Sequence, residues 1–183
     1  SRIKSDKFSE VAAEVFAANG IQVYTYPELM PTPSLSFAVR HLKCSGGIVV
    51  TASHNPSKYN GYKVYGADGC QITTEAAAAV LAEIEKLDIF ADVKKIDFDE
   101  QIESVDMFHD VKRVAFAEGQ KEGKISYIGE ETVTAFINAV SAQSLCGNEK
   151  IDKDVSIVYT PLNGAGLKCV TRCLKENGFT NIS

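Results

Sequence analysis

Apolar residues along this chain follow helical and strand spacing in turn, in short segments separated by glycine, proline and polar residues. The first helix is predicted from apolar positions three and four residues apart, namely Phe8, Val11, Ala12, Val15 and Phe16. Residues 21–26 alternate and are rich in β-branched and aromatic types, as strands are. Pro31-Thr32-Pro33 opens a second predicted helix, and Ser45-Gly46-Gly47 is expected to stop it before a strand at 48–51. Helix, strand, helix and strand in this order predict an α/β layer.

The later part of the pattern predicts a hairpin, three helices and two more strands. These elements are strands at 61–65 and 70–72, helices at 75–86 and 130–144, a strand at 155–159, a helix at 167–177 and a strand beginning at Phe179. Ala67-Asp68-Gly69 is the predicted hairpin turn, and Thr73 or Thr74 is expected to cap the helix that follows. Residues 88–126 are acidic and mixed in pattern, which predicts an irregular excursion or short strands.

The predicted fold class is α/β: a layered helix-sheet-helix domain with a mixed, mostly parallel sheet, then the first βαβ part of a second, similar domain. Residues 1–145 are expected to form the first domain and residues 146–183 the start of the second. The sequence begins directly at a helix, without a leading strand, and ends just after a strand begins. We therefore expect the N-terminal part of the first domain, and most of the second, to lie outside these residues.

Composition and charge restrict the partners that we expect. The 183 residues carry a formal net charge of −5, which gives no electrostatic reason to expect nucleic acid. The longest apolar stretches, such as 76–81, are too short to span a bilayer, so no membrane partner is predicted. The five cysteines, Cys44, Cys70, Cys146, Cys169 and Cys173, are odd in number and lack a CxxC pair. They predict reduced thiols and a cytoplasmic location, whereas the oligomeric state stays unknown.

The strongest chemical signal is the run Thr51-Ala52-Ser53-His54-Asn55-Pro56, which continues from the apolar strand 48–51. Asn60-Gly61-Tyr62-Lys63 follows one short loop later. A hydroxyl, an imidazole and an amine are therefore expected close together, on a loop that a rigid strand positions. A serine hydroxyl is a weak nucleophile unless a base or a metal assists it.

Three uses of Ser53 compete at this point. In phosphoryl transfer, Ser53 carries a phosphate, Lys63 acts as a cation or as acid and base, and His54 contacts phosphate oxygens or moves a proton. Acyl transfer by a Ser-His pair is disfavoured, because the Gly-x-Ser-x-Gly elbow is missing and adjacent side chains diverge on an extended backbone. In the third, purely structural use, these residues only complete a tight turn before Pro56.

The segment from Gly47 to Tyr65, continued by Asp68-Gly69, resembles the phosphoserine loop of the α-D-phosphohexomutases. Within it, residues 60–65 are similar to the bacterial phosphoglucomutase and phosphopentomutase-like branch. Other stretches that resemble the family are Ser1-Arg2 before the first helix, Pro31-Thr32-Pro33 at the start of the second, and Tyr159-Thr160-Pro161-Leu162-Asn163-Gly164.

This resemblance implies an isomerase that interconverts hexose 1-phosphate and hexose 6-phosphate through a sugar bisphosphate, which would also be the activator. Ser53 would carry the transferred phosphate, and that phosphate would be one ligand of Mg²⁺. Lys63 would be a general acid and base, and His54 would also belong to the catalytic set. The residues that the resemblance assigns to substrate or phosphate binding are Thr51, His54, Asn55, Lys63 and Arg2.

Other parts of the implied site have no counterpart in the sequence. The family's Asp-x-Asp-x-Asp metal loop is imitated only by Asp152 and Asp154, which lack the third carboxylate and the following arginine. The remaining Mg²⁺ ligands and the sugar-recognition loop are expected outside this chain, so the chain alone is expected to be inactive. The preferred sugar phosphate is not distinguishable. The alternative function is a non-catalytic α/β relative that serves as an interaction module.

The remaining motifs are assigned structural roles. Asn163-Gly164-Ala165-Gly166 lies between a strand and a helix, but Cys169 stands where the third glycine of a dinucleotide pattern would fall, so a tight turn is expected. Cys169 and Cys173 lack partners for a metal site. His41 is expected at a helix end, where a cation is favoured, and His109 at the surface or partly buried.

Overall fold

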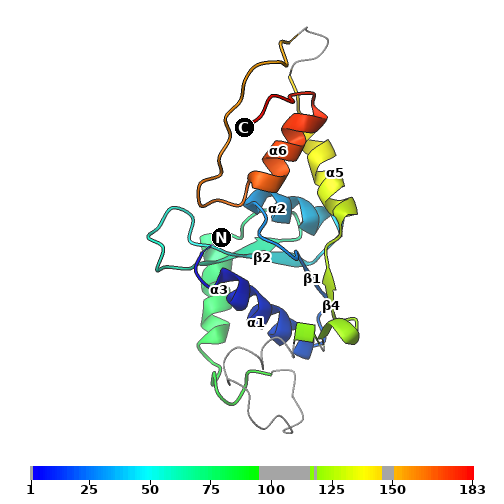
Figure 1. Ribbon diagram of the computed structural model, residues 1–183. Coiled ribbons are helices and arrows are strands. Elements are labelled where there is room, and N and C mark those ends of the chain that lie inside the picture. The colour runs from blue at the N-terminus through cyan, green and yellow to red at the C-terminus, as the bar shows by residue number, and fades with distance from the viewer. Residues whose placement is uncertain (1, 95–115, 118, 146–150) are drawn as a thin grey trace, which may run out of the picture.

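The computed structural model describes residues 2–94, 116–117, 119–145 and 151–183 (Figure 1). The helices discussed are α1 (Ser5–Ala18), α2 (Thr32–His41), α3 (Thr74–Ile84), α5 (Glu130–Ser141) and α6 (Leu167–Glu176). The strands are β1 (Val23–Thr25), β2 (Gly46–Val50), β3 (Tyr62–Gly66) and β4 (Ile125–Tyr127). These elements confirm the α/β class. His109, Cys146 and the central part of the segment 88–126 lie outside the described residues.

The four strands form two separate two-stranded sheets in the described parts of the chain. β1 pairs in parallel with β4, with Val23 opposite Ile125, and β2 pairs antiparallel with β3, with Val50 opposite Tyr62. The sequence predicted a single mixed, mostly parallel sheet. The β2–β3 pair is antiparallel because the chain returns directly through one loop, whereas parallel strands require a long crossover such as the one between β1 and β4.

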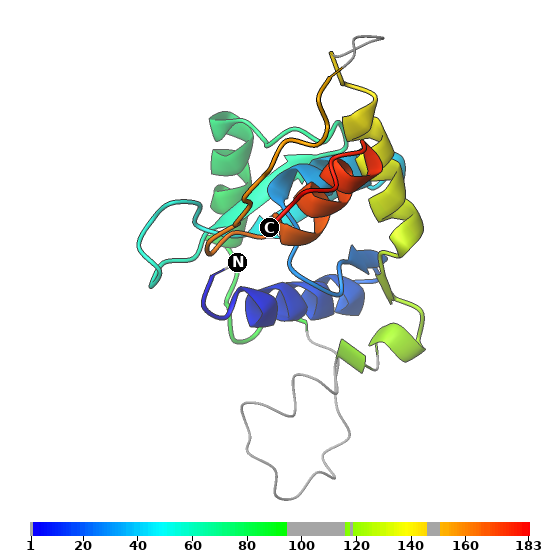
Figure 2. The same ribbon diagram turned by 45° about the horizontal axis from the view of Figure 1, so that its top comes forward.

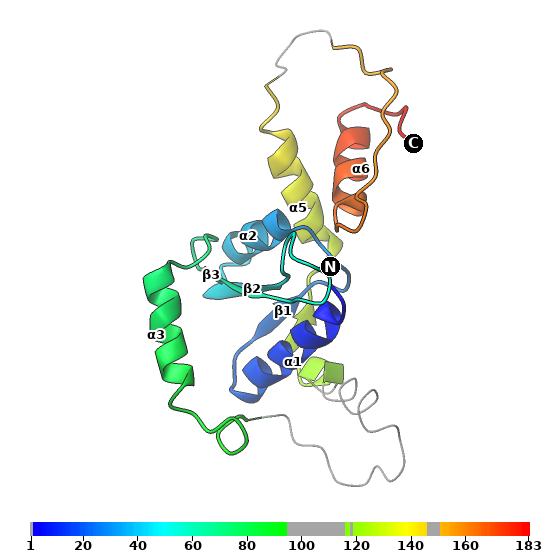
Figure 3. The ribbon, with the colours of Figure 1, turned by 90° about the vertical axis from the view of Figure 1, so that its left-hand side faces the viewer.

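The β2–β3 ribbon lies between two helices, as the predicted helix-sheet-helix layering requires (Figure 3). α2 covers the face of Gly47: a Cβ on this glycine would lie 2.5 Å from Cγ2 of Val39. The missing side chain therefore allows α2 to approach the strand closely. α1 covers the opposite face, where Val50 and Tyr62 line a largely apolar cavity of about 490 Å³ together with Phe8.

The best-buried cluster joins α1 to the β1–β4 sheet. Ala13 and Ala17 of α1 meet Ile125 of β4 and Phe116, and Val23 of β1 packs against them. Both alanines are small, so the helix can approach the two strands closely. Ile125 is 2% exposed, and its burial removes a whole branched side chain from water.

The start of α3 agrees with the prediction, whereas the end of α2 does not. Thr73 caps α3, as expected, because its Oγ1 accepts a hydrogen bond from the backbone N–H of Ala76 at 3.2 Å. The predicted stop of α2 at Ser45-Gly46-Gly47 is wrong: the helix ends at His41, and Lys43 takes the left-handed conformation with φ 55°. Turn hydrogen bonds, such as the one from Cys44 N–H to Val39 O at 2.8 Å, complete the end of the helix before the glycines begin β2.

The hairpin after β3 is shorter than predicted. Residues 70–72 contribute one antiparallel bridge, between Tyr65 and Gln71, and Gly69 turns with φ 76°. α3 then stands apart from the other helices (Figure 3) and contains no buried residue. Its apolar side chains Val80, Leu81 and Ile84 are about half exposed.

In the C-terminal segment the predicted helix is present, but neither of the strands predicted at 155–159 and from Phe179 forms, and the two stretches share one isolated parallel bridge between Ile157 and Ile182. Ile157 N–H donates to Asn181 O at 2.9 Å, and Ser183 N–H donates back to Ile157 O at 2.9 Å. α6 lies between these two bridge residues in the sequence and runs beside α5 (Figures 1 and 2). The division of the chain at residue 145 stays a prediction.

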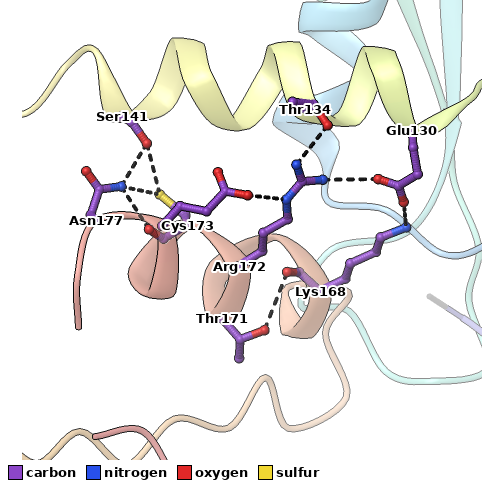
Figure 4. A network of polar contacts seen from close by, with 9 residues as sticks. Glu130, Thr134, Ser141, Lys168, Thr171, Arg172, Cys173 and Asn177 are labelled. Carbon is purple, nitrogen blue, oxygen red and sulfur yellow. Dashed lines mark hydrogen bonds and ion pairs between the residues drawn. The ribbon is translucent and has the colours of Figure 1, made fainter. Parts of the chain in front are cut away.

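Charged side chains hold α6 against α5 (Figure 4), and Lys168 also joins α6 to the segment after β1. Nζ of Lys168 contacts Oε1 of Glu28 at 2.6 Å and also Oε1 of Glu130. Arg172 donates to Oε2 of Glu130 at 3.0 Å and to Oγ1 of Thr134 at 2.7 Å. The hydrogen bond from Lys168 lowers the pKa of the Glu130 carboxyl, and burial opposes this only in part. We call these five side chains the α5–α6 ion network.

We expect Ile125→Ala to lower the free energy of unfolding by about 2–5 kcal/mol, because it leaves a cavity between α1 and the β1–β4 sheet. Urea denaturation followed by circular dichroism measures the change. Ile89→Ala is the matched control, because Ile89 is 65% exposed. Equal losses in the two variants would contradict the packing described for Ile125.

We expect Lys168→Met to lower the free energy of unfolding by no more than about 1 kcal/mol, because water and salt screen exposed ion pairs. The pKa of Glu130 is lowered in the folded state, so its contribution is present above the unfolded pKa and is lost as pH falls through the folded pKa. The difference from the unsubstituted protein should therefore shrink on acidification and in high salt. Lys175→Met, on the exposed last turn of the same helix, is the control. A difference independent of pH would contradict the ionic account.

Candidate functional site

The residues that follow β2 form an exposed loop at one end of the β2–β3 ribbon. Thr51 N–H donates to Gly61 O at 2.9 Å and continues the ladder one residue beyond the Val50–Tyr62 pair. Residues 52–60, here called the serine loop, connect the two strands. Ala52 is 8% exposed and anchors the start of the loop, whereas residues 53–59 are exposed.

Ser53 lies in a turn with a backbone conformation that serine rarely adopts. Its φ of 51° falls in the left-handed region, and such residues are concentrated at functional sites. Its N–H donates to Oγ1 of Thr51 at 3.4 Å, and Asn55 N–H closes the turn on Ala52 O at 3.0 Å. The backbone at Ser53 is not extended, so the expected divergence of the adjacent Ser53 and His54 side chains on an extended strand does not apply. Acyl transfer is still disfavoured, because the Gly-x-Ser-x-Gly elbow is missing.

Lys63 lies on the strand next to the one that ends in the serine loop. It is opposite Val49, two residues from the Thr51–Gly61 pair. Because side chains alternate along a strand, Lys63 shares a face with Thr51, which is its diagonal neighbour across the ladder. Among the described residues, no carboxylate forms an ion pair with Lys63. Its ammonium group is therefore available beside the start of the loop.

The segment before α1 contacts the serine loop at two points. Nη2 of Arg2 donates to the carbonyl oxygen of Asn55, and to that of Pro56 at 3.2 Å. In the opposite direction, Nδ2 of Asn60 donates to Ile3 O at 2.8 Å. The structure thus places Arg2 at the loop, although its contacts there are with carbonyls. A contact of Arg2 with phosphate stays a prediction.

The residues predicted for the site therefore gather at one end of the ribbon: Thr51, Ser53, His54 and Asn55 in or beside the loop, Lys63 on β3, and Arg2 against the loop. The side chains of His54 and Asn55 are exposed. The sequence alone did not assign roles to Asn60 and Gly61. An Asn-Gly pair directly before a strand is typical of a turn, and this pair was the signal for them in the sequence. A Cβ on Gly61 would lie 2.6 Å from Thr51 O, so a glycine is needed for the strands to meet here.

A second overlooked signal is the distribution of charge. Residues 29–67 contain no aspartate or glutamate, although the whole chain has 24 of them and a net charge of −5. The lysines and arginines of this segment are Arg40, Lys43, Lys58 and Lys63. The loop that carries Ser53 therefore belongs to a locally basic part of an acidic chain. Such a part attracts anions.

The described residues do not by themselves fit a magnesium ion. They contain no group of three or more histidine, cysteine, aspartate or glutamate side chains arranged to hold a metal. Asp152 and Asp154 are exposed, and Asp152 Oδ1 accepts a hydrogen bond from Asp154 N–H at 3.0 Å, as in a local turn. Mg²⁺ requires close to octahedral oxygen coordination, of which a phosphate on Ser53 would supply one ligand.

The remaining motifs have structural roles. The predicted turn at 163–166 is confirmed, since Gly164 N–H donates to Pro161 O at 2.8 Å and α6 follows directly. His41 lies in the last turn of α2 and stacks on Phe37 at a ring-centroid distance of 5.2 Å. Cys169 is buried in α6, and this burial raises the pKa of its thiol. Within the described parts of the chain, no helix is long and apolar enough to cross a membrane.

Comparison with known proteins identifies the fold that carries this loop. Residues 1–89 match the family described as phosphoglucomutase/phosphomannomutase, alpha/beta/alpha domain I. The chain is 34% identical over 179 residues to the phosphoglucomutase of Staphylococcus haemolyticus. Residues 1–89, which carry the serine loop, belong to the phosphoglucomutase/phosphomannomutase family. Ser53, Lys63 and the loop between them lie inside the part that matches this phosphohexomutase domain.

Other phosphohexomutase relatives agree. The phosphoglucomutase of Staphylococcus aureus strain USA300 is 47% identical over 83 residues, which is 45% of this chain and 15% of that protein. A crystal structure of a protein classed as a phosphomannomutase, from Thermus thermophilus, matches with a TM-score of 0.58 and 27% identity. That match covers 99% of this chain and 34% of the other. The match to the Staphylococcus haemolyticus protein covers 98% of this chain and 29% of the relative's length.

We expect Gly61→Ala to separate β2 from β3 at the base of the serine loop, because the new Cβ would lie 2.6 Å from Thr51 O. Overpacking of this kind costs about 1–3 kcal/mol. Hydrogen exchange at the Thr51 amide, followed by NMR, should become faster. Gly123→Ala is the control: Gly123 has φ 72° but nothing within 4 Å, so it shows the effect of backbone strain alone. Unchanged protection of Thr51 in Gly61→Ala would contradict the contact.

Proposed function

We propose that the protein containing this chain is a phosphoglucomutase-type isomerase in which Ser53 carries the transferred phosphate. The observation that supports this most directly is the exposed Ser53, in a left-handed turn at the end of β2, with Lys63 on the adjacent strand. The basic character of residues 29–67 favours a phosphorylated substrate. The named relatives, phosphoglucomutases and a protein classed as a phosphomannomutase, are consistent with this activity.

The proposed reaction transfers two phosphoryl groups, one from Ser53 to the sugar and a different one from the sugar back to Ser53. A hydroxyl oxygen of the hexose phosphate attacks phosphorus on phosphoserine 53, the bond from phosphorus to Oγ breaks, and a sugar bisphosphate forms. Lys63, as the neutral amine, takes the hydroxyl proton. After the bisphosphate turns over, Oγ of Ser53 attacks the other phosphate, and protonated Lys63 returns the proton to the oxygen that leaves. Positioning and charge do most of the work in such transfers, since their transition states need little covalent assistance.

His54 and Asn55 extend from the same turn as Ser53, and the proposal assigns them to binding of the phosphate or the sugar. Mg²⁺ is proposed as a cofactor of the whole protein, with its further ligands outside the described residues, and a sugar bisphosphate is proposed as the activator. A phosphosugar is the proposed substrate, and a cytoplasmic location belongs to the same proposal. The 183 residues alone are expected to be inactive.

We expect the full-length protein to accept phosphate on Ser53 when it is incubated with glucose 1,6-bisphosphate. Ser53→Ala should abolish this labelling and reduce mutase turnover by at least about a thousandfold, because it removes the nucleophile. Intact mass and peptide mapping measure the phosphate, and a coupled assay measures turnover. Ser57→Ala is the matched control, since Ser57 is an exposed serine of the same loop.

A second pair of variants tests the proton transfer. Lys63→Met should slow turnover by about 100- to 10,000-fold, as expected for loss of a general acid and base, whereas Lys175→Met in the exposed last turn of α6 should have little effect. Full activity of Ser53→Ala would refute the proposed function. Absence of both labelling and turnover in the unsubstituted protein would favour the non-catalytic interaction module.

A further inference from the structure

The serine loop makes few hydrogen bonds of its own. Two backbone hydrogen bonds stabilise it internally, from Asn55 N–H to Ala52 O and from Tyr59 N–H to Pro56 O, both at 3.0 Å, and a third joins Ser53 N–H to Oγ1 of Thr51 just before the loop. The loop is exposed from residue 53 to residue 59, so packing contributes little there. Fixing one residue in a single backbone conformation costs about 1–2 kcal/mol of entropy. A loop of this kind needs contacts from outside to hold Ser53 in an unusual conformation.

Those outside contacts come from the segment that precedes α1, and they run in both directions. Arg2 donates from a single Nη2 atom to two successive loop carbonyls, those of Asn55 and Pro56. Asn60, at the far end of the loop, donates to the carbonyl of Ile3. The middle of the loop and its far end are thereby fastened to neighbouring residues of one short segment.

That short segment is itself fixed by the start of α1. Arg2 N–H donates to Oγ of Ser5 at 3.2 Å, and Ser5 N–H donates back to Arg2 O at 3.0 Å. Ser5 is 4% exposed, so this reciprocal pair is anchored in the body of the domain. The position of the loop is therefore coupled to α1, which packs on the β1–β4 sheet and on β2.

We propose that Arg2 and Asn60 are positioning residues, which hold the serine loop in the conformation from which Ser53 transfers phosphate. The inference rests on the proposed function and adds a role that differs from phosphate binding. In the structure, Nη2 of Arg2 is engaged by carbonyl oxygens of the loop, and Asn60 contacts the backbone of Ile3. Neither side chain needs to touch the substrate to act. A small displacement of a reacting group lowers a rate by about 100-fold.

An arginine suits this position better than a lysine does. Its guanidinium is planar and always charged, and its several donors can serve neighbouring acceptors in a fixed geometry, whereas lysine presents a compact and mobile charge. Two buried atoms at this junction have no hydrogen-bond partner, Nε of Arg2 and Oδ1 of Asn60. A donor and an acceptor therefore remain unused, and each unsatisfied buried group carries an energetic cost.

The test uses the full-length protein with Arg2→Gln, Arg2→Lys and Asn60→Ala, singly and with Arg2→Gln and Asn60→Ala combined. We expect Arg2→Gln and Asn60→Ala each to lower kcat and the single-turnover rate of Ser53 phosphorylation by glucose 1,6-bisphosphate by about 10- to 100-fold, with KM nearly unchanged. Arg2→Lys should restore only part of the rate. The double variant should lose less than the product of the single losses, because both contacts hold the same loop.

A second readout follows the loop itself. Lys58 is exposed in the serine loop, so trypsin cleavage after Lys58 should become faster in each positioning variant. Lys175→Gln is the control, since Lys175 is exposed in the last turn of α6 and belongs to neither the serine loop nor the basic segment 29–67. It should leave both the cleavage rate and kcat unchanged.

The outcomes separate this inference from the proposed function. A raised KM with unchanged kcat in Arg2→Gln would overturn the positioning role and favour direct substrate binding. Unchanged kcat, KM and cleavage after Lys58 would also overturn it. If Ser53→Ala were fully active, the proposed function would fail, and the rate of cleavage after Lys58 would then decide alone whether Arg2 and Asn60 hold the loop.

Discussion

The candidate site depends on the register of the antiparallel β2–β3 ladder. Val49 lies opposite Lys63 and Val50 opposite Tyr62, and the pair Thr51–Gly61 closes the base of the serine loop. A slip of one residue would move Lys63 to the face that α1 covers and would separate its amine from the residues around Ser53. Gly61 helps to fix this register, since a side chain there would collide with Thr51 O. One backbone pairing thus determines the relation between the two reactive groups.

The helices support this ladder from both faces, and α1 does so in two ways. It packs on β2 and on the β1–β4 sheet, and the segment at its N-terminus reaches the serine loop through Arg2 and Ile3. α2 approaches the other face closely because Gly47 has no side chain. The loop therefore belongs to a rigid scaffold at both ends, which is the usual arrangement for loops that perform chemistry. α3 contributes no buried residue to this scaffold.

The sequence predicted the helices well, because each one has a regular apolar spacing and most have a clear boundary residue, such as Thr73 before α3. It predicted less well where tertiary contacts decide. Gly46 and Gly47 suggested a helix stop, but they begin β2, where Gly47 serves the contact with α2. Periodicity likewise could not show that β2–β3 and β1–β4 form separate sheets, since strand partners are set by long-range packing. Periodicity also could not predict the contacts of Arg2, because they join residues more than fifty positions apart.

The arrangement of charge is compatible with the proposed phosphate site in a chain whose net charge is −5. A phosphoserine carries between one and two negative charges near neutral pH, and a second phosphate on the sugar would add to them. Lys58 and Lys63 lie in or beside the loop, and the absence of carboxylates from residues 29–67 leaves these cations unopposed by acidic neighbours in sequence. By contrast, Lys168 and Arg172 of α6 lie among Glu28, Glu130 and Glu176, where they are already paired. Cations therefore serve two separate purposes in this chain. The paired cations join α6 to neighbouring segments. The unpaired cations near Ser53 are suited to bind phosphate.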